Sequence, residues 1–318
     1  MRIRMYPLWV LVGILLFFSV AVGVLYFSFG TRPETGRWVA ECIEKKSYAV
    51  RSKSPKIVIL AGSNGLYGFS AQRISEKYGI ESVNAATHAG LGIGYILYYG
   101  RQYFAKGRLF ILPLEYELYG GSWGDPAYFY QVIGYDPGYF HSLSLIDKYN
   151  FFRAISMDDR INLFVASMSP YPKNNSNGYQ SRTLNSWGDE TNNKLSDRTP
   201  AMTAPVIKNA APLKYSINTD SWRKLEDFVR DANYAGCKVV LAYPNIYSKA
   251  LDVNLNHDFF TELQQKASKS GISIIGSPQN SSYGEESLWD TFYHQTRAGQ
   301  TKSTDRLMSD ILKTGFCK

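Results

Sequence analysis

The chain is poor in the residues that hold metal ions or build disulfide frameworks. Its 318 residues include three cysteines and four histidines, and none of these forms an H-x-x-x-H or C-x-x-C pattern. A zinc site is therefore not expected, and no cofactor is predicted. So few cysteines also exclude a disulfide-held scaffold, and a chain of this length can bury a core large enough to do without one.

Runs of basic residues are missing as well. Lysine and arginine number 35 against 27 acidic residues, a net charge of +8, but no five basic residues are consecutive. So scattered a distribution argues against nucleic-acid binding. The positive balance suits an anionic polymer or an anionic membrane surface as a partner, and it carries no information about the fold.

Charge is absent altogether from residues 6–30, an almost entirely apolar stretch. About 20 apolar residues suffice to cross the hydrocarbon core of a bilayer. Arg2 and Arg4 precede the stretch, and the basic residues that follow it are diluted by Glu34, so the positive-inside bias favours a cytoplasmic N-terminus. We predict a single-pass membrane anchor over residues 1–30 and an extracytoplasmic domain, periplasmic or at the cell surface. A cleaved signal peptide is the alternative, but no small-x-small cleavage site follows the stretch.

A juxtamembrane segment is expected at residues 31–55, with a short amphipathic helix around residues 38–46. Cys42 in this segment and Cys317 lie near the two ends of the exported domain, and domain ends often lie close together. A disulfide between them is one hypothesis for an oxidising compartment, and two unpaired thiols are the other. Cys237 opens an apolar run and is expected to be a buried small hydrophobe.

From residue 56 to residue 318 short apolar runs alternate with amphipathic stretches, a pattern typical of a parallel α/β sheet. Strands are predicted at 56–61, 81–85, 108–114, 238–243 and 272–275. Helices are predicted at 70–78, 94–104, 221–235, 259–270 and 298–313. This order predicts a three-layer, flavodoxin-like sheet, in which ligands bind outside the carboxyl ends of the strands.

An insertion at about residues 117–215 interrupts the alternation. It is rich in Tyr, Asn, Ser, Gly and Pro; some helix is expected at 144–167, and residues 169–182 are expected to be exposed loop. Aromatic residues cluster around its start, where they either stack on sugar rings or fill a satellite core over the sheet edge. They are Tyr116, Tyr119, Trp123, Tyr128, Phe129, Tyr130 and Tyr135.

Three polar clusters follow predicted strands and are expected to meet at the carboxyl edge of the sheet. Ser63 lies between a strand end and a helix start, a turn that exposes its hydroxyl and places backbone N–H groups nearby. The glycine-rich residues 84–94 follow the second strand, and Gly90 or Gly92 there could present another N–H. Asp290 and His294 are four positions apart, so the carboxylate can orient the imidazole that takes the serine proton.

This order, G-S-N, then a glycine-rich stretch, then Asp and His before a terminal helix, resembles the SGNH (GDSL-type) hydrolases. Within that superfamily the chain is most similar to membrane-anchored members that modify surface polysaccharides, such as the alginate O-acetyltransferase proteins and the D-alanyl transfer protein of teichoic acid synthesis. The resemblance implies that Ser63 is the nucleophile, His294 the general base and Asp290 its orienting carboxylate. It also implies that the backbone amides of Ser63 and Gly92 contribute to an oxyanion hole.

The chain departs from the family pattern at two places. The family's D-x-x-H spacing is one residue longer here, because Asp290 and His294 enclose three residues. The family's G-x-N-D block after the third strand is replaced by residues 112–117, which contain no asparagine. Either Asn64 or His88 substitutes as the side-chain donor, or the site is not an efficient hydrolase. Glu115 in this block binds a sugar hydroxyl or accepts backbone N–H bonds as a structural group.

These features predict an extracytoplasmic acyltransferase, most simply an acetyltransferase, that acts on a cell-surface polysaccharide through Ser63, His294 and Asp290. The resemblance implies a membrane-bound O-acyltransferase as the partner that supplies acyl groups. A carbohydrate esterase of the same fold is the first alternative, because it uses the same nucleophile and base. A non-catalytic glycan-binding or assembly protein is the second, favoured by the missing asparagine and opposed by the intact Ser-His-Asp set.

Overall fold

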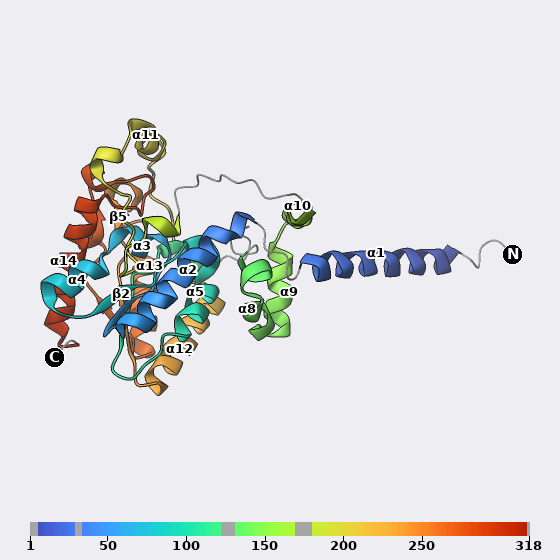
Figure 1. Cartoon of the computed structure of the whole chain (residues 1–318), viewed down its shortest axis with the longest axis horizontal. Coiled ribbons are helices and arrows are strands. Elements are labelled where there is room, and N and C mark those ends of the chain that lie inside the picture. Colours follow the sequence, from blue (N-terminus) through green and yellow to red (C-terminus); the bar gives the residue numbers. More distant parts are fainter. Residues whose placement is uncertain (1–5, 29–33, 122–130, 169–179, 317–318) are drawn as a thin grey trace. The chain divides into compact units, whose positions relative to one another are not determined.

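The computed structural model of the protein describes residues 6–28, 34–121, 131–168 and 180–316 (Figure 1). The chain divides into two compact units. The smaller unit comprises Met1–Arg37 and Trp123–Asn175, and the larger unit comprises Trp38–Ser122 and Ser176–Lys318. The predicted insertion is thus shared between the units: its first half clusters with the N-terminal segment and its second half with the sheet.

A five-stranded parallel sheet organises the larger unit, which confirms the predicted α/β class. Its strands run in the order β2-β1-β3-β4-β6. Their bounds are β1 Ile57–Ile59, β2 Ser82–Asn84, β3 Leu109–Leu112, β4 Lys238–Ala242 and β6 Ser273–Ile275. All five coincide with predicted strands. β1 and β3, in the middle of the sheet, are short apolar runs buried throughout, as expected of parallel strands covered on both faces.

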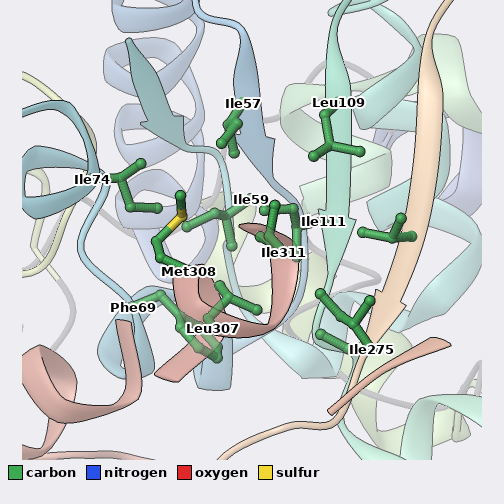
Figure 2. Close-up of a cluster of buried hydrophobic side chains, with 12 residues drawn as sticks. Ile57, Ile59, Phe69, Ile74, Leu109, Ile111, Ile275, Leu307, Met308 and Ile311 are labelled. Carbon is green, nitrogen blue, oxygen red and sulfur yellow. The ribbon is translucent and has the colours of Figure 1, made fainter. Parts of the chain in front are cut away.

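One face of the sheet is covered by α4 (Ala71–Tyr78) and α14 (Arg297–Thr314). Ile57 and Ile59 of β1 pack there against Leu307, Met308 and Ile311 of α14 in one buried cluster (Figure 2). Full burial of one such side chain contributes about 1.5–3 kcal/mol. This face therefore anchors the C-terminal helix beneath the strand that leads into Ser63.

Residues of opposite parity face α5 (Gly92–Arg101) and α12 (Thr219–Tyr234). Phe110 of β3 packs edge-on against Phe228 of α12, with ring centroids 5.7 Å apart. A Cβ at Gly100 would lie 3.2 Å from the Phe228 ring and closer still to Leu60 of the sheet, so only glycine lets α5 approach this closely. The alternation of side chains along the strands thus separates two apolar layers and gives the predicted three-layer arrangement.

The helices begin where short polar side chains cap them. Ser70, Asn218 and Thr296 each accept a backbone N–H of the first turn of α4, α12 and α14. α4 ends at Gly79, whose φ of 68° terminates the helix in the left-handed region. Such caps explain why the predicted helix bounds differ from the observed ones by only a few residues.

Several elements were not predicted. A second, two-stranded parallel sheet joins β5 (Ile246–Tyr247) to β7 (Ser282–Tyr283). Two residues per strand are too short for a period-two pattern to show in the sequence. α13 (His257–Lys269) matches the helix predicted at 259–270. The other helices of the larger unit are α3 Ser63–Gly68, α6 Tyr116–Gly120 and α11 Pro200–Lys208, with 3-10 turns at Ala89–Leu91, Ser181–Thr183, Leu195–Asp197, Ser248–Ala250, Gln279–Ser281 and Glu285–Ser287.

The second half of the insertion covers the edge strand β2. The Asn84 N–H donates to the Trp187 carbonyl at 2.8 Å. Lys46 of α2 (Glu34–Lys53) is completely buried, and its Nζ donates to the Asn84 and Gly188 carbonyls at 2.9 and 2.6 Å. Burial lowers the pKa of Lys46 to about 8 because the charged form loses hydration. These bonds cover the edge of the sheet, so β2 does not present unpaired backbone groups to another chain. The helix α2 that carries Lys46 is longer than the amphipathic helix predicted at 38–46.

Cys42 is a buried, free thiol, and so is Cys237. Burial raises the pKa of Cys42 to about 11. The proposed partner, Cys317, lies outside the described residues. The hypothesised disulfide therefore falls partly outside the described residues, and the burial of Cys237 agrees with its predicted role as a small hydrophobe.

The smaller unit is helical. α1 (Tyr6–Ser28) carries no charged residue, and α8 (Pro137–Ser142), α9 (Leu145–Ala154) and α10 (Met157–Met168) follow a π-helical turn at Gln131–Tyr135. The helix expected at 144–167 is thus two helices, because Ser156 accepts the Asp159 N–H and starts a new one. Among the residues that the structure describes, no helix is long and apolar enough to be assigned as membrane-spanning. Residues 21, 22 and 24–28 of α1, whose side chains are not described, are not covered by this statement.

Candidate active site

Ser63 is the first residue of α3, and only three residues separate it from the end of β1. Gly62 before it has no room for a side chain, because a Cβ there would lie 2.6 Å from Glu115 Oε1 and 2.7 Å from the Ala89 Cα. The strand end, the α3 N-terminus and the loop after β2 therefore converge at Ser63. Ser63 is only 9% exposed, so this turn buries the residue rather than exposing its hydroxyl as predicted, because the three segments pack around it.

Asp290 and His294 are in direct contact. His294 Nδ1 lies 2.5 Å from Asp290 Oδ1. The residues between them form a bent turn rather than a helix, closed by the Trp289 N–H on the His294 carbonyl at 2.9 Å. The turn is attached to the small second sheet through the Tyr247 N–H, which donates to the Phe292 carbonyl at 2.7 Å. The extra residue of the D-x-x-x-H spacing is absorbed in this turn, so the longer spacing does not separate the two side chains.

Tyr67 links this pair to the serine. The rings of His294 and Tyr67 stack with centroids 4.2 Å apart and planes at 13°. Tyr67 lies four residues after Ser63 in α3, so both project from the same face of that short helix. The structure thus brings His294, which is 2% exposed, to the helix face that carries Ser63. Sequence reasoning missed Tyr67, although its i,i+4 spacing from Ser63 was a usable signal.

Two backbone N–H groups at this point have no acceptor among the described residues, those of Ser63 and Ala89. Both belong to the first residue of a helix, where N–H groups lack intrahelical partners. The N–H of Gly92, in contrast, donates to the Ala89 carbonyl. The second open backbone N–H group is therefore that of Ala89 rather than the predicted Gly92, whose φ of 74° serves the turn into α5.

Asn64 does not replace the missing side-chain donor. It is completely buried, its Nδ2 donates to the Pro113 carbonyl at 2.8 Å, and its Oδ1 accepts the Asn245 N–H at 2.9 Å. These bonds tie α3 to the ends of β3 and β4. Asn64 is a structural residue of the site, and its side chain reaches no surface from which a substrate could be bound.

Glu115 lies three residues after the end of β3, and it holds the start of α3. Its carboxylate accepts the Gly62 N–H at 3.1 Å and the Asn64 N–H at 2.7 Å, on either side of Ser63. Burial raises the pKa of Glu115 to about 7, against the opposing effect of these backbone bonds. Of the two roles open to Glu115, the structure supports the structural one, since the side chain is 2% exposed.

A pH-dependent stability follows from Glu115. Its pKa is higher in the folded chain, about 7, than the usual 4.5, so the folded state binds more protons between these values. The contribution of Glu115 to stability is therefore present at low pH and lost as pH rises. Relative to Glu115→Gln, the unfolding free energy of the wild type should fall by about 2 kcal/mol between about pH 5 and about pH 7. Urea titrations of both proteins measure it; a constant difference would contradict the pKa shift.

His88 borders the same loop. Its Nδ1 accepts the Gly90 N–H at 3.0 Å, which leaves Nε2 as the protonated nitrogen of the neutral ring. Trp38 at the start of α2 packs edge-on against this ring at 5.6 Å. Of the two donors considered from the sequence, Asn64 is buried and His88 is half-buried.

Two of the aromatic residues at the start of the insertion belong to the larger unit and are described by the structure, and both are part of its hydrophobic core. Tyr116 and Tyr119 are buried and pack against Phe259 of α13. Tyr135 belongs to the smaller unit, and Trp123, Tyr128, Phe129 and Tyr130 lie outside the described residues. A polar pair that the sequence did not reveal flanks the site instead: Tyr293 Oη donates to Glu117 Oε2 at 2.6 Å.

Within the described part of the chain, no group of three His, Cys, Asp or Glu side chains is placed to hold a metal ion. The chain matches no protein-family model and no curated protein. Chemical interpretation therefore relies on the site itself: a serine at a helix start, two open N–H groups, and a buried histidine bonded to a carboxylate.

Proposed function

We propose that the protein is a membrane-anchored acyltransferase, transferring an acetyl-type group to a cell-surface polysaccharide through Ser63, His294 and Asp290. One observation carries the proposal. His294 is bonded to Asp290 on one side and stacked on Tyr67 on the other, and Tyr67 shares a helix face with Ser63. A histidine with no catalytic role has no need of both an orienting carboxylate and a position beside a serine at a strand end.

The proposed reaction follows from these contacts. An ionised carboxylate only accepts hydrogen bonds, so Asp290 holds the proton on Nδ1 of His294 and leaves Nε2 as the base. Ser63 Oγ attacks the acyl carbonyl carbon and passes its proton to Nε2, which delivers it to the leaving alkoxide of the donor. A glycan hydroxyl then attacks the acyl-serine and loses its proton to Nε2. The bond between Ser63 Oγ and the acyl carbon breaks, and Nε2 returns the proton to Oγ, so both residues are restored.

Negative charge develops on the acyl carbonyl oxygen in the transition state, and hydrogen-bond donors that are already in position stabilise it. The N–H groups of Ser63 and Ala89 provide them, and Glu115 fixes the α3 start by holding the N–H groups on both sides of Ser63. Transfer to a sugar rather than to water also requires a water-poor site. The low exposure of Ser63 and His294 supports transfer over hydrolysis for this reason.

The membrane anchor forms part of the proposal. It is supported by the absence of charge throughout α1 and by the exposure of its apolar side chains from Tyr6 to Val20. An anchor over residues 1–30 with the N-terminus in the cytoplasm would hold the larger unit on the outer side, near an integral-membrane O-acyltransferase that supplies acyl groups. The net charge of +8 suits an anionic glycan as the acceptor.

Intact-mass analysis of the full chain with an activated acetyl ester tests the proposal. We expect one acetyl adduct on the wild type that is lost in Ser63→Ala and kept in Ser268→Ala, a control at an exposed serine of α13. A long-lived adduct would support a transferase awaiting its glycan. Rapid acetate release without an adduct would favour the esterase, and neither adduct nor release from folded protein would favour the non-catalytic role.

A further inference from the structure

Two helices of the smaller unit present large apolar side chains to their surroundings. On α9 these are Leu145, Ile146 and Tyr149, and on α10 they are Met157 and Ile161. Their exposed fractions range from 52% to 84%. Leu145 and Tyr149, like Met157 and Ile161, are one helical turn apart, so each helix carries an apolar stripe rather than scattered residues.

These stripes are additional to the faces by which the unit holds together. Phe151 of α9 is buried against Phe140 of α8, with ring centroids 5.6 Å apart, and Ile155 between α9 and α10 is buried too. Ser144 and Ser156 accept the Asp147 and Asp159 N–H groups and start the two helices. Both helices are therefore well formed and apolar on a second, outward side.

The helix α10 borders the predicted anchor. α10 is in contact with α1, and both belong to the smaller unit. α1 has no charged residue, and its side chains along residues 6–20 are exposed and mostly apolar. If α1 lies in lipid, α10 beside it must border the same lipid. We therefore take lipid to be what covers the exposed apolar side chains of α9 and α10.

The charged residues of α9 and α10 favour neither anionic nor neutral lipid headgroups. The basic residues Lys148, Arg153 and Arg160 are balanced by three acidic ones, Asp147, Asp158 and Asp159, so the net charge over residues 145–168 is zero. Arg153 follows Tyr149 by one turn, where its long side chain can reach the headgroups while its stem lies along the apolar stripe. Association driven by apolar burial is therefore expected in neutral membranes as well as anionic ones.

We propose that α9 and α10 form a membrane-interface module: they lie in the headgroup region beside α1, with Leu145, Ile146, Tyr149, Met157 and Ile161 in the lipid. This proposal rests on the membrane anchor of the proposed function and is independent of the chemistry at Ser63. Helices of this kind bury their apolar face about 5–10 Å into the boundary between headgroups and acyl chains. The first half of the insertion would then serve as a second attachment to the membrane.

Depth-dependent fluorescence quenching of the full chain in phosphatidylcholine vesicles tests this module. Cys42 and Cys237 are buried, so single cysteines for an environment-sensitive label can be introduced into a Cys317→Ser background. We expect labels at Ile146→Cys and Ile161→Cys to be quenched more by lipids that carry the quencher near the headgroup than by lipids that carry it at the bilayer centre. A label at Asn162→Cys, exposed but about 100° around α10 from Ile161, is the matched control and should be quenched far less. Adding anionic lipid or salt should change none of these results.

A label at Leu15→Cys in α1 separates the two proposals. Quenching at Leu15 without quenching at Ile146 and Ile161 would overturn the interface module and leave the anchor intact. Absence of quenching at all three positions would overturn both. Energy transfer between copies of the protein labelled at Ile161, in place of lipid quenching, would also overturn the interface module. It would show that the apolar side chains of α10 form a dimer contact. In a second measurement, Ile146→Asp combined with Ile161→Asp should abolish quenching of a label at Met157→Cys.

Discussion

Replacing Asp290 by asparagine is expected to lower the rate of acyl transfer about 10⁴-fold, the loss that this change causes in a Ser-His-Asp site. The physical reason lies in the contact between Asp290 Oδ1 and His294 Nδ1. An asparagine offers an NH₂ group or a weaker carbonyl acceptor there, so the imidazole no longer holds its proton on Nδ1, and Nε2 ceases to be the base. The fold should be unaffected, because the Asp290 side chain is 34% exposed.

Steady-state turnover of an activated acetyl ester by the two proteins measures this effect. Asp258→Asn, at an exposed position in the first turn of α13, is the matched control and should retain wild-type turnover. Adduct formation at Ser63 should slow in Asp290→Asn without disappearing. A loss of less than about tenfold would contradict the role of Asp290 as the orienting carboxylate.

The second large effect is expected for stability. Asp189→Ala should lower the free energy of unfolding by about 4 kcal/mol, because Asp189 is completely buried and accepts several hydrogen bonds. Its carboxylate accepts the Ala71 and Gln72 N–H groups at 2.7 and 2.9 Å and the Ser70 hydroxyl at 2.8 Å. Without it the first turn of α4 would keep buried donors with no acceptor, and the partial positive charge of the helix start would lose its counterpart.

Thermal and urea unfolding of the full chain check this prediction, and a fall of about 6 °C in Tm is expected for a protein of this size. Asp197→Ala, an exposed acidic residue of the same insertion, should change stability by less than about 0.5 kcal/mol. Asp189→Asn, which keeps one acceptor oxygen, should fall between the two. Equal stability of Asp189→Ala and Asp197→Ala would show that Asp189 is not needed at the α4 start.

The buried pair of Asp189 and Lys46 also explains how an insertion can be part of the core. Lys46 reaches the carbonyls of Asn84 and Gly188, and Asp189 bonds the start of α4, so the chain around residue 188 is held on two sides. Gly188 itself has φ of 80°, and a Cβ there would collide with the Asn84 carbonyl. Nothing in the local sequence marks this segment, because its partners lie about a hundred or more residues away.

The local pattern of the sequence was sufficient for the layered sheet. Runs such as residues 56–61 and 238–243 are apolar and β-branched, and the caps at Ser70 and Thr296 mark helix starts, so strand and helix positions follow from period and capping alone. The order Ser63, Asp290, His294 could likewise be read directly, and the structure brings Asp290 and His294 into contact.

Only the tertiary structure determined which hydrogen-bond partner each polar atom at the carboxyl edge of the sheet has. Glu115, Asn64 and Gly92 were all plausible ligands of a substrate, yet each has its hydrogen bonds occupied by the protein: Glu115 by the N–H groups around Ser63, Asn64 by Pro113 and Asn245, and Gly92 by Ala89. A buried polar atom must find a partner, and its partner is set by which chain segments meet in space rather than by the residue type. Composition and period therefore predicted the sheet, and the order of the motifs predicted the candidate set of Ser63, Asp290 and His294. The open N–H group of Ala89, in place of Gly92, emerged only once the fold had satisfied the other polar atoms.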